Sequence, residues 1–509
     1  MNKTFAALAM AAAATAASAA DYRDKLSVTI GGSSPVEQQA VISVDKETDG
    51  TYRLSLRNFS LSMGGETMYV GDVVIGPIKP AEAAGGVWLG AEKTITIAEG
   101  AEPADAYWMG PMIGEVPVSL RALEKDGRLR AVIDIDMAGA GKVAVEFGDG
   151  YQLPNPGFES FHKASMGNSE SDEPDGWHSF MSCTGSLAGI VGGTPHTFIS
   201  KDTRPGSTGS KSVCIASGKV LGVVVANGTL TTGRLTAGAM SAADTGNHSF
   251  LDLSHADKDA NGDPFYATLA ARPDSIAAWV RFEQGTPSAD FPYATVSAVI
   301  TDGTRYQEPE DKEYTNVAAK AADRQIAATG GQWKRISMPF DYGSFASNGA
   351  EAKAILVTMS TNAGAGKGSG SDSLYVDDME LVYNAGLKSL SVAGKPLAGF
   401  SPGVYAYEVE AASLSAGDIS AEVEGCGAFA VTEIEGGKAF VTVVSADLKK
   451  AVKYTIAYGG KAPTGISSAA AETGAGAVYD LRGIKVDGAA AKGLYIMRGA
   501  GGKAVKVAR

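Results

Sequence analysis

The sequence predicts an all-β protein with several domains in a row. The chain has 509 residues, which exceeds the length of a single domain. Short runs of alternating apolar and polar residues recur along it, separated by turns rich in Gly, Asn and Asp. Its 64 glycines and the scarcity of long amphipathic patterns argue against a helical protein.

Charge and hydropathy exclude several classes of partner. The net charge of -13 argues against nucleic acid, whose phosphates need a basic surface, and against docking on anionic lipid. Beyond the N-terminus no apolar run reaches ~18 residues, so no transmembrane span is expected.

Residues 1–20 are predicted to be a signal peptide. Lys3 supplies the positive end, an alanine-rich apolar stretch follows, and Ala17-Ser18-Ala19 fits the small-residue cleavage rule. An N-terminal helix is the alternative. We therefore expect a secreted, extracellular protein, with attachment to the outer cell surface as an option. No cysteine follows the cleavage site, so a lipid anchor is not expected.

The three cysteines cannot form a disulfide framework in so long a chain. Cys183 and Cys214 lie in one predicted domain and could pair, because export permits disulfides. Buried thiols are the alternative, and Cys426 would be left over in either case.

Residues 21–149 are predicted to be antiparallel strands in a barrel or sandwich. The dipeptides Asp49-Gly50 and Asp126-Gly127 each separate two strand patterns, and Asp-Gly tolerates the positive φ angles of hairpin turns. In "RAVIDID", Ile133 and Ile135 alternate with acidic residues, which indicates one dry and one wet face.

This segment resembles the calycin-like β-barrel domain of exported Bacteroidetes proteins. The resemblance rests on "DGTYRLSLRNFSL", "YVGDVVIG", "GEVPVSL" and "VAVEFGDGY". Barrels of this kind can enclose a small ligand, but side chains can equally fill them, and we favour the filled interior.

Residues 150–385 carry the pattern of a β-sandwich, with many short strands separated by turn-rich loops. The segment resembles the carbohydrate metabolism domain of Bacteroidetes and, more distantly, carbohydrate-binding jelly rolls. The matching stretches are "NPGFES", "PDGWHS", "TGSKSV", "AAWVRF", "GQWKRISMPF" and "LYVDDMELVY".

Three shorter segments follow. Residues 386–460 resemble a small immunoglobulin- or cadherin-like sandwich that serves as a spacer, and residues 461–476 have the composition of a linker. Residues 477–509, a short β tail, resemble the C-terminal sorting tail of Bacteroidetes secretion systems, which implies sorting machinery as a partner. The tail carries the family features Gly483, Gly493-Leu494-Tyr495, Lys503, Lys506 and Arg509. An ordinary terminal hairpin cluster is the alternative.

The resemblance to sugar-binding jelly rolls implies a structural calcium ion near the first and last strands. Calcium takes 6–8 oxygen ligands and mixes carboxylates with backbone carbonyls. Glu159 and Asp377 would supply carboxylates, and Gly157 and Lys211 would supply carbonyls. The alternative is a solvated Glu159 and an Asp377 that hydrogen-bonds a loop.

Other candidates for metal binding are weaker in the sequence. "DKDANGDPF" places Asp257, Asp259, Asn261 and Asp263 at alternate positions, but it lacks the distal glutamate of a calcium loop, so a polar turn is favoured. The five histidines lack metal-ligand spacing, so no histidine site is expected.

Strand alternation nominates a sugar-binding platform in the sandwich. Three strand patterns each place an aromatic residue beside polar neighbours, and ring faces stack on the C–H face of a pyranose. If these strands lie side by side, the platform consists of Trp279, Arg281, Tyr293, Thr295, Trp333 and Arg335. The alternative is that the tryptophans are buried.

The function expected is non-catalytic binding of a glycan or polysaccharide, which would support its capture or use. No carboxylate pair or nucleophile motif stands out, so an enzyme is not favoured. The alternatives are a glycan-acting hydrolase whose acids lie in loops, and a structural or adhesive surface protein that binds other proteins.

Overall fold

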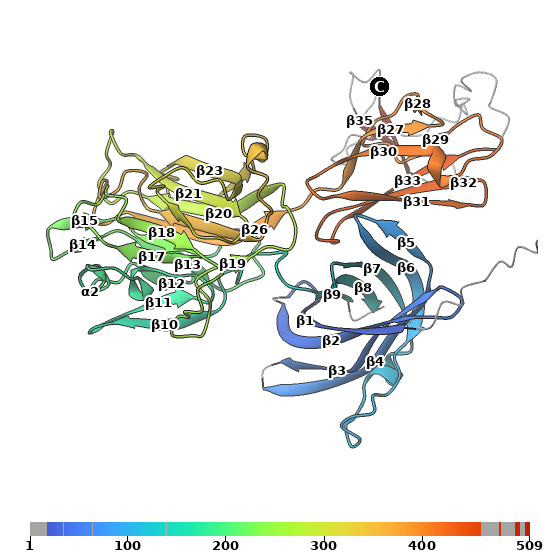
Figure 1. The fold of residues 1–509 in the computed structure, drawn as a ribbon, viewed down its shortest axis with the longest axis horizontal. Coiled ribbons are helices and arrows are strands. Elements are labelled where there is room, and N and C mark those ends of the chain that lie inside the picture. The colour runs from blue at the N-terminus through green and yellow to red at the C-terminus, as the bar shows by residue number, and fades with distance from the viewer. Residues whose placement is uncertain are drawn as a thin grey trace, which may run out of the picture.

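A computed structural model describes residues 18–33, 35–63, 65–137 and 141–459, and the strands Val478–Tyr479, Leu494–Arg498 and Ala504–Ala508. The described chain is built almost entirely of strands, which confirms the all-β prediction (Figure 1). The predicted signal peptide lies outside the described residues, except that residues 18–20 open β1. Among the helices of the described residues, none has the length and apolar character that a membrane crossing requires.

The N-terminal domain is one nine-stranded antiparallel sheet, in the order β4-β3-β2-β1-β9-β8-β7-β6-β5. It curls until Asp72 on β4 exchanges two backbone hydrogen bonds with Ala98, just beyond β6. The elements are β1 (Ser18–Ile30), β2 (Val36–Lys46), β3 (Tyr52–Met63), β4 (Glu66–Ile78), β5 (Pro80–Ala83), β6 (Gly86–Thr96), α1 (Gly110–Ile113), β7 (Glu115–Lys125), β8 (Arg128–Met137) and β9 (Gly141–Phe147).

Local sequence explains both the turns and the core of this barrel. Asp126 and Gly127 adopt φ angles of 50° and 72° between β7 and β8, as the Asp-Gly turn predicts. Aliphatic side chains such as Leu26, Ile42 and Leu54 are fully buried in its interior, in agreement with the filled barrel that we favoured.

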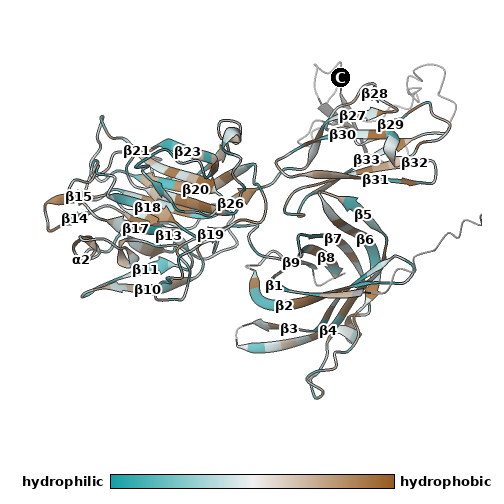
Figure 2. Cartoon of the chain, in the orientation of Figure 1, coloured by the Kyte–Doolittle hydropathy of each residue, from teal (hydrophilic) through white to brown (hydrophobic). Residues whose placement is uncertain are grey.

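The central domain is a two-layer sandwich with the sheets β12-β13-β26-β20-β24 and β16-β25-β21-β23, the latter extended by β19. Alternate residues of both sheets form the core; on β20 these are Ile276, Ala278, Val280 and Phe282, as predicted. Figure 2 shows hydrophobic residues along β20. The strands of the two sheets are β12 (Thr197–Ser200), β13 (Ser212–Ala216), β16 (Thr229–Thr231), β19 (Ala267–Thr268), β20 (Ser275–Glu283), β21 (Tyr293–Thr301), β23 (Val317–Ala327), β24 (Lys334–Pro339), β25 (Ala354–Ser360) and β26 (Ser373–Val382).

Smaller elements surround this sandwich. The hairpin β10-β11 precedes it in the chain, and the sheet β17-β18-β22 shares a second apolar cluster with β21 and β25. The bounds are β10 (Phe161–Met166), β11 (Ser169–Pro174), η1 (Phe180–Ser182), α2 (Ala188–Val191), β14 (Gly218–Val220), β15 (Val224–Ala226), β17 (Arg234–Ala237), β18 (Asn247–Leu251), β22 (Tyr306–Glu308) and η2 (Ala346–Asn348).

The third domain is a small sandwich of the sheets β28-β27-β30 and β29-β33-β32-β31. Its elements are β27 (Gly386–Val392), β28 (Lys395–Pro396), β29 (Ala406–Glu408), η3 (Ala416–Asp418), β30 (Ile419–Glu424), β31 (Phe429–Glu435), β32 (Lys438–Val444) and β33 (Ala451–Ala457). The predicted linker lies outside the described residues. In the tail β34 (Val478–Tyr479), β35 (Leu494–Arg498) and β36 (Ala504–Ala508) form a sheet.

The small sandwich packs onto the barrel and does more than space two domains (Figure 1). Trp88 of the barrel meets Phe429 of β31 edge to face, with ring centroids 5.5 Å apart. On β8, Arg130 and Val132 point outward from the barrel and yet are buried, because the small sandwich covers them. The alternation of apolar and polar residues along β8 would by itself predict that this outer side of the strand is exposed to solvent.

The structure agrees with the alternative in which the cysteines are unpaired thiols. Cys183, Cys214 and Cys426 are all free, and the first two are buried. Burial raises the pKa of the Cys183 thiol to about 12, so this thiol stays protonated and unreactive at neutral pH.

Candidate functional site: an aromatic face and a histidine–carboxylate cluster

Aromatic and arginine side chains line up across the outer face of the sheet β12-β13-β26-β20-β24. Phe198 lies opposite Cys214, Cys214 opposite Tyr375, and Tyr375 opposite Arg281, so all four project to the same side. Trp279 shares this side two residues along β20. We call Phe198, Trp279, Arg281 and Tyr375 the aromatic face.

Contacts within this face hold its planar groups in place. The Arg281 guanidinium lies 3.8 Å from the centre of the Tyr375 ring and also pairs with Asp202 and Glu283. The Arg204 guanidinium lies 5.7 Å from the centre of the Trp279 ring. Phe198 keeps 40% of its surface exposed, so the face offers rings and hydrogen-bonding groups together.

Two of the three strands predicted for the sugar platform are neighbours. On β20 and β24, Trp279 lies directly opposite Arg335, and Lys334 opposite Val280. Trp279 and Trp333 are both half-buried and neither belongs to the sandwich core. Arg335 pairs with Glu380 at 3.0 Å. The strand phases predicted for β20 and β24 are therefore confirmed.

The third strand lies elsewhere, so the six predicted residues do not form one face. Tyr293 and Thr295 are on β21, which belongs to the opposite sheet. The chain crosses from one sheet to the other between β20 and β21, and alternation within a strand carries no information about that crossing. Thr295 is only 7% exposed, because the outer side of β21 is also covered.

Glu159 lies beside the "TGSK" loop, as the calcium prediction required. Its carboxylate accepts hydrogen bonds from the backbone N–H groups of Ser210 and Lys211, at 3.0 and 3.1 Å. The Lys211 Nζ donates to the Glu159 carbonyl at 2.7 Å, and the ligand role of the Lys211 backbone carbonyl stays a prediction. These contacts compensate the charge that follows the buried Phe158.

Asp377 is fully buried on β26, next to Asp378 and the loop between β12 and β13. Its Oδ2 accepts from the Arg204 N–H at 2.8 Å, while its Oδ1 has no hydrogen-bond partner among the described residues. Burial raises the pKa of Asp377 to about 6. A Cβ on Gly157 would lie 3.4 Å from the Asp378 Oδ1, so this glycine is also close by.

Calcium binding at Glu159 and Asp377 stays a prediction. We expect millimolar calcium to raise the melting temperature of the metal-free chain, since a ligand at tenfold its Kd stabilises by about 1.4 kcal/mol. Asp377→Asn should abolish this shift, and Asp257→Asn, a change at an exposed acid of the same domain, should retain it. No calcium-induced shift in the wild-type chain, or equal shifts in all three proteins, would contradict the site.

A second constellation lies on the hairpin β10-β11 and a distant loop. His162 on β10 is directly opposite Glu173 on β11, so both project from the same face of the hairpin. His178 follows β11 and is fixed by backbone hydrogen bonds to Thr231. Asp259 comes from the loop between β18 and β19. We call His162, Glu173, His178 and Asp259 the histidine–carboxylate cluster.

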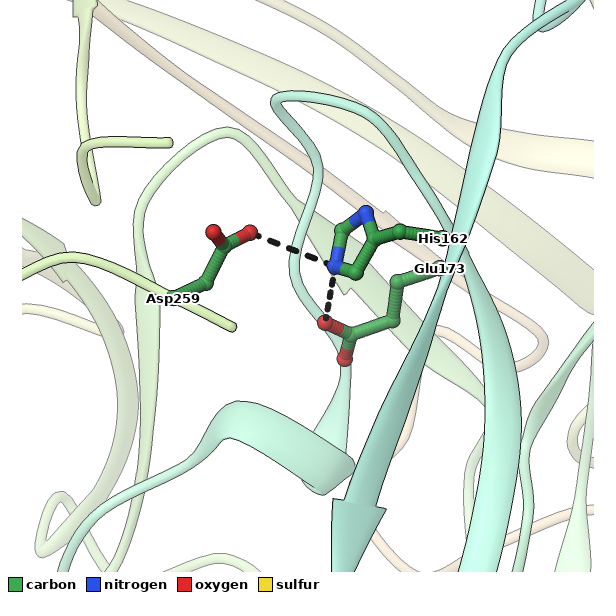
Figure 3. Close-up of side chains that lie close together, drawn as sticks. All are labelled: His162, Glu173 and Asp259. Atoms are coloured by element: carbon green, nitrogen blue, oxygen red, sulfur yellow. Dashed lines mark ion pairs between the residues drawn. The ribbon is translucent and has the colours of Figure 1, made fainter. Parts of the chain in front are cut away.

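The donor atoms of His162, Glu173 and Asp259 lie within 4.8 Å of one another (Figure 3). His162 Nε2 lies 3.4 Å from Asp259 Oδ2 and 3.8 Å from Glu173 Oε2, and His178 Nε2 lies 3.3 Å from the same Asp259 oxygen. The four side chains are between 0% and 10% exposed. Within the described chain, none of these four atoms has a hydrogen-bond partner.

In three of these side chains, the polar atom that points away from the centre of the cluster contacts a partner that fixes its position. His162 Nδ1 lies 3.0 Å from Asp175 Oδ1. Glu173 Oε1 accepts from Ser179 N, Ser179 Oγ and Ser182 Oγ at 2.7, 2.5 and 3.0 Å. Asp259 Oδ1 accepts from the N–H groups of Asn261 and Asp263. The side chains are thus oriented before anything binds.

The sequence prediction missed this cluster. The chain brings in Asp259 from a loop far from the hairpin, so no linear metal motif marks the cluster, and the expectation of no histidine metal site stays untested. One local signal was available. Gly167-Asn168 is a two-residue hairpin turn, and the register that it sets pairs Met166 with Ser169 and hence His162 with Glu173.

Comparison with known protein families supports the prediction of a calycin-like barrel for the N-terminal domain. Residues 19–149 match the family model described as a calycin-like beta-barrel domain. The N-terminal domain is a calycin-like barrel. Its limits agree closely with the predicted residues 21–149, and the curled nine-stranded sheet is consistent with the family. None of the curated proteins compared matches the chain.

Among solved structures, the chain is similar to the M60 catalytic domain with the CBM51-1 and CBM51-2 domains from Clostridium perfringens ZmpB. The identity is 10%, the match covers 99% of this chain and 43% of the other, and the TM-score is 0.15. Because that TM-score is low, nothing about the function of this chain follows from the similarity.

Proposed function

We propose that this protein binds glycans without catalysis, through the aromatic face of its central sandwich. The observation that carries the proposal is the alignment of Phe198, Tyr375 and Arg281 across three strands, with Trp279 beside them. Ring faces stack on the apolar side of a pyranose, and planar guanidinium and carboxylate groups bond its hydroxyls.

The neighbouring charges fit a neutral polyhydroxy ligand. Arg281 is paired with Asp202 and Glu283, so the face holds donors and acceptors without a large excess of one sign. Binding to such a shallow face is weak per site, and repeated sugar units or several copies of the protein would increase it. We also propose export to the cell exterior, because the sequence predicts a signal peptide and resembles a C-terminal sorting tail.

Removal of the ring from Tyr375 tests the proposal. A glycan array of the full chain should identify a ligand, and Tyr375→Ala should then bind it at least tenfold more weakly, a loss of about 1.4 kcal/mol. Tyr375→Phe keeps the ring and should retain most of the affinity. Tyr107→Ala removes a 71%-exposed ring from the barrel and is the matched control.

Two results would refute the assignment of this face. One is unchanged affinity in Tyr375→Ala and Trp279→Ala, which would move the site elsewhere. The other is the absence of glycan binding together with binding to cell-envelope or host proteins, which would favour the adhesive alternative. Release of reducing sugar by the wild-type chain would favour the hydrolase.

A further inference from the structure

We propose that His162, Glu173 and Asp259 of the histidine–carboxylate cluster form a site for one tetrahedral divalent transition metal ion, with zinc as the ion of choice. His162 Nε2, Glu173 Oε2 and Asp259 Oδ2 would be its three protein ligands, and His178 lies beside Asp259 outside this group. The site is separate from the aromatic face and does not depend on the function proposed for that face.

Burial without partners is the first argument. The side chains of Glu173, Asp259 and His162 are 0%, 1% and 10% exposed, yet the atoms that face one another make no hydrogen bonds within the described chain. Leaving one buried polar group unpaired costs about 1–3 kcal/mol, and more for a charged group. Three such atoms close together indicate a missing common partner.

The distances provide the second argument. Ligands that lie 2.0–2.1 Å from a tetrahedral zinc ion are separated from one another by about 3.3–3.4 Å. His162 Nε2 lies 3.4 Å from Asp259 Oδ2 and 3.8 Å from Glu173 Oε2, and the three donors all lie within 4.8 Å of one another. The two distances from His162 are close to those that a tetrahedral ion requires.

Two protonated histidines would also balance the two carboxylates. Such pairs should, however, close to the roughly 2.7–2.9 Å of charge-assisted hydrogen bonds. The separations of His162 Nε2 from Asp259 and Glu173 are longer, at 3.4 and 3.8 Å. An ion between the three donors accounts for these separations better than direct ion pairs do.

The donor set selects the class of metal. An imidazole nitrogen with two carboxylate oxygens suits zinc and its first-row neighbours, while calcium and magnesium prefer oxygen ligands alone. Three protein ligands would leave the fourth position of a tetrahedral ion to a water molecule. The Asp175 contact to His162 is the carboxylate–histidine pairing common around zinc.

The ion would join two parts of the chain that are far apart in sequence. It would hold the hairpin β10-β11 against the loop between β18 and β19. That loop already contacts the turn after β11 through the Gly176 N–H, which donates to Asp263 Oδ2 at 2.9 Å. Metal binding should therefore stabilise this end of the central sandwich.

Metal titration of the full chain tests the proposal. After removal of metal with dipicolinate, we expect one cobalt(II) ion per chain to bind with a tetrahedral d–d spectrum, and one equivalent of zinc to displace it. Excess calcium should leave the spectrum unchanged. His162→Gln and Glu173→Gln should abolish the spectrum, and Asp175→Asn should weaken binding about 10–100-fold.

The matched control is His255→Gln, in the same loop as Asp259 but with a half-exposed side chain, and it should bind as the wild type does. If the ligand variants fail to fold, X-ray absorption of the zinc-loaded wild-type chain still tests the site, because it must show an imidazole ligand. Failure to bind cobalt or zinc, an octahedral spectrum, or unchanged binding in both folded ligand variants would overturn the site.

Discussion

Replacement of Arg130 by alanine is expected to lower the free energy of unfolding of the barrel and small-sandwich unit by about 3–5 kcal/mol. The Arg130 side chain is 3% exposed and pairs with Glu146 at 2.8 Å. It also donates to the carbonyl oxygens of Gly148 and Asp447, and its guanidinium lies 4.5 Å from the centre of the Tyr151 ring. Its loss leaves the Gly148 and Asp447 carbonyl oxygens without this donor, while Glu146 keeps its ion pair with Lys449.

Hydrogen exchange resolved by mass spectrometry can assign this loss to a domain, since a multidomain chain does not unfold in one step. Exchange should increase on β8, β9 and the loop that carries Asp447. Arg128→Ala is the control, because the Arg128 side chain is 59% exposed and makes only weak contacts in the described chain, an ion pair with Asp24 at 3.8 Å and a hydrogen bond to the Asp149 carbonyl at 3.4 Å. Equal effects of the two substitutions would contradict a junction role for Arg130.

The same interaction should depend on pH in a defined direction. Burial pulls the pKa of Glu146 upward, but the charges of Lys449 and Arg130 outweigh it and hold the pKa below the ordinary 4.5. A carboxylate with a lowered pKa contributes its stabilisation above pH 4.5, and this is lost as the pH falls through the folded-state value. The difference in the free energy of unfolding between the wild type and Arg130→Ala should therefore become smaller at acidic pH.

The second large effect is expected for Trp177→Ala, at about 3–5 kcal/mol in the stability of the central sandwich. Trp177 is 0% exposed, and its ring centroid lies 5.3 Å from that of Phe158. Its indole N–H donates to the Pro154 carbonyl at 2.9 Å. A cavity in the core and an unpaired carbonyl would result together.

Trp177→Phe separates these two contributions. It keeps most of the apolar volume but leaves the Pro154 carbonyl unpaired, so a smaller loss of about 1–3 kcal/mol is expected. Both variants should be compared by urea unfolding in metal-free buffer, so that a change in metal binding at the nearby histidine–carboxylate cluster does not contribute to the measured difference in stability. A loss below 1 kcal/mol in Trp177→Ala would show that the core collapses around the deletion.

Several features followed from the sequence because they depend on neighbours along the chain. Alternation on β20 predicted which side of the strand is dry, since the side-chain period of a strand is two. Asp126-Gly127 predicted its turn because few residues accept positive φ angles.

Other features depended on which strands meet. Alternation placed Tyr293 on an outer face but could not assign its strand to a sheet, so the predicted platform combined residues from two sheets. Tyr375 and Phe198 join the aromatic face only through the register of β12, β13 and β26. Arg130 is buried because another domain covers a strand that is locally wet on that side.

The sequence by itself determined the all-β class, the barrel at the N-terminus and the buried faces of strands such as β20 and β24, because these follow from local backbone preferences and periodicity. Only the tertiary structure decided that His162, Glu173 and Asp259 converge. Such convergence depends on contacts between distant segments, and these form when the core is packed as a whole.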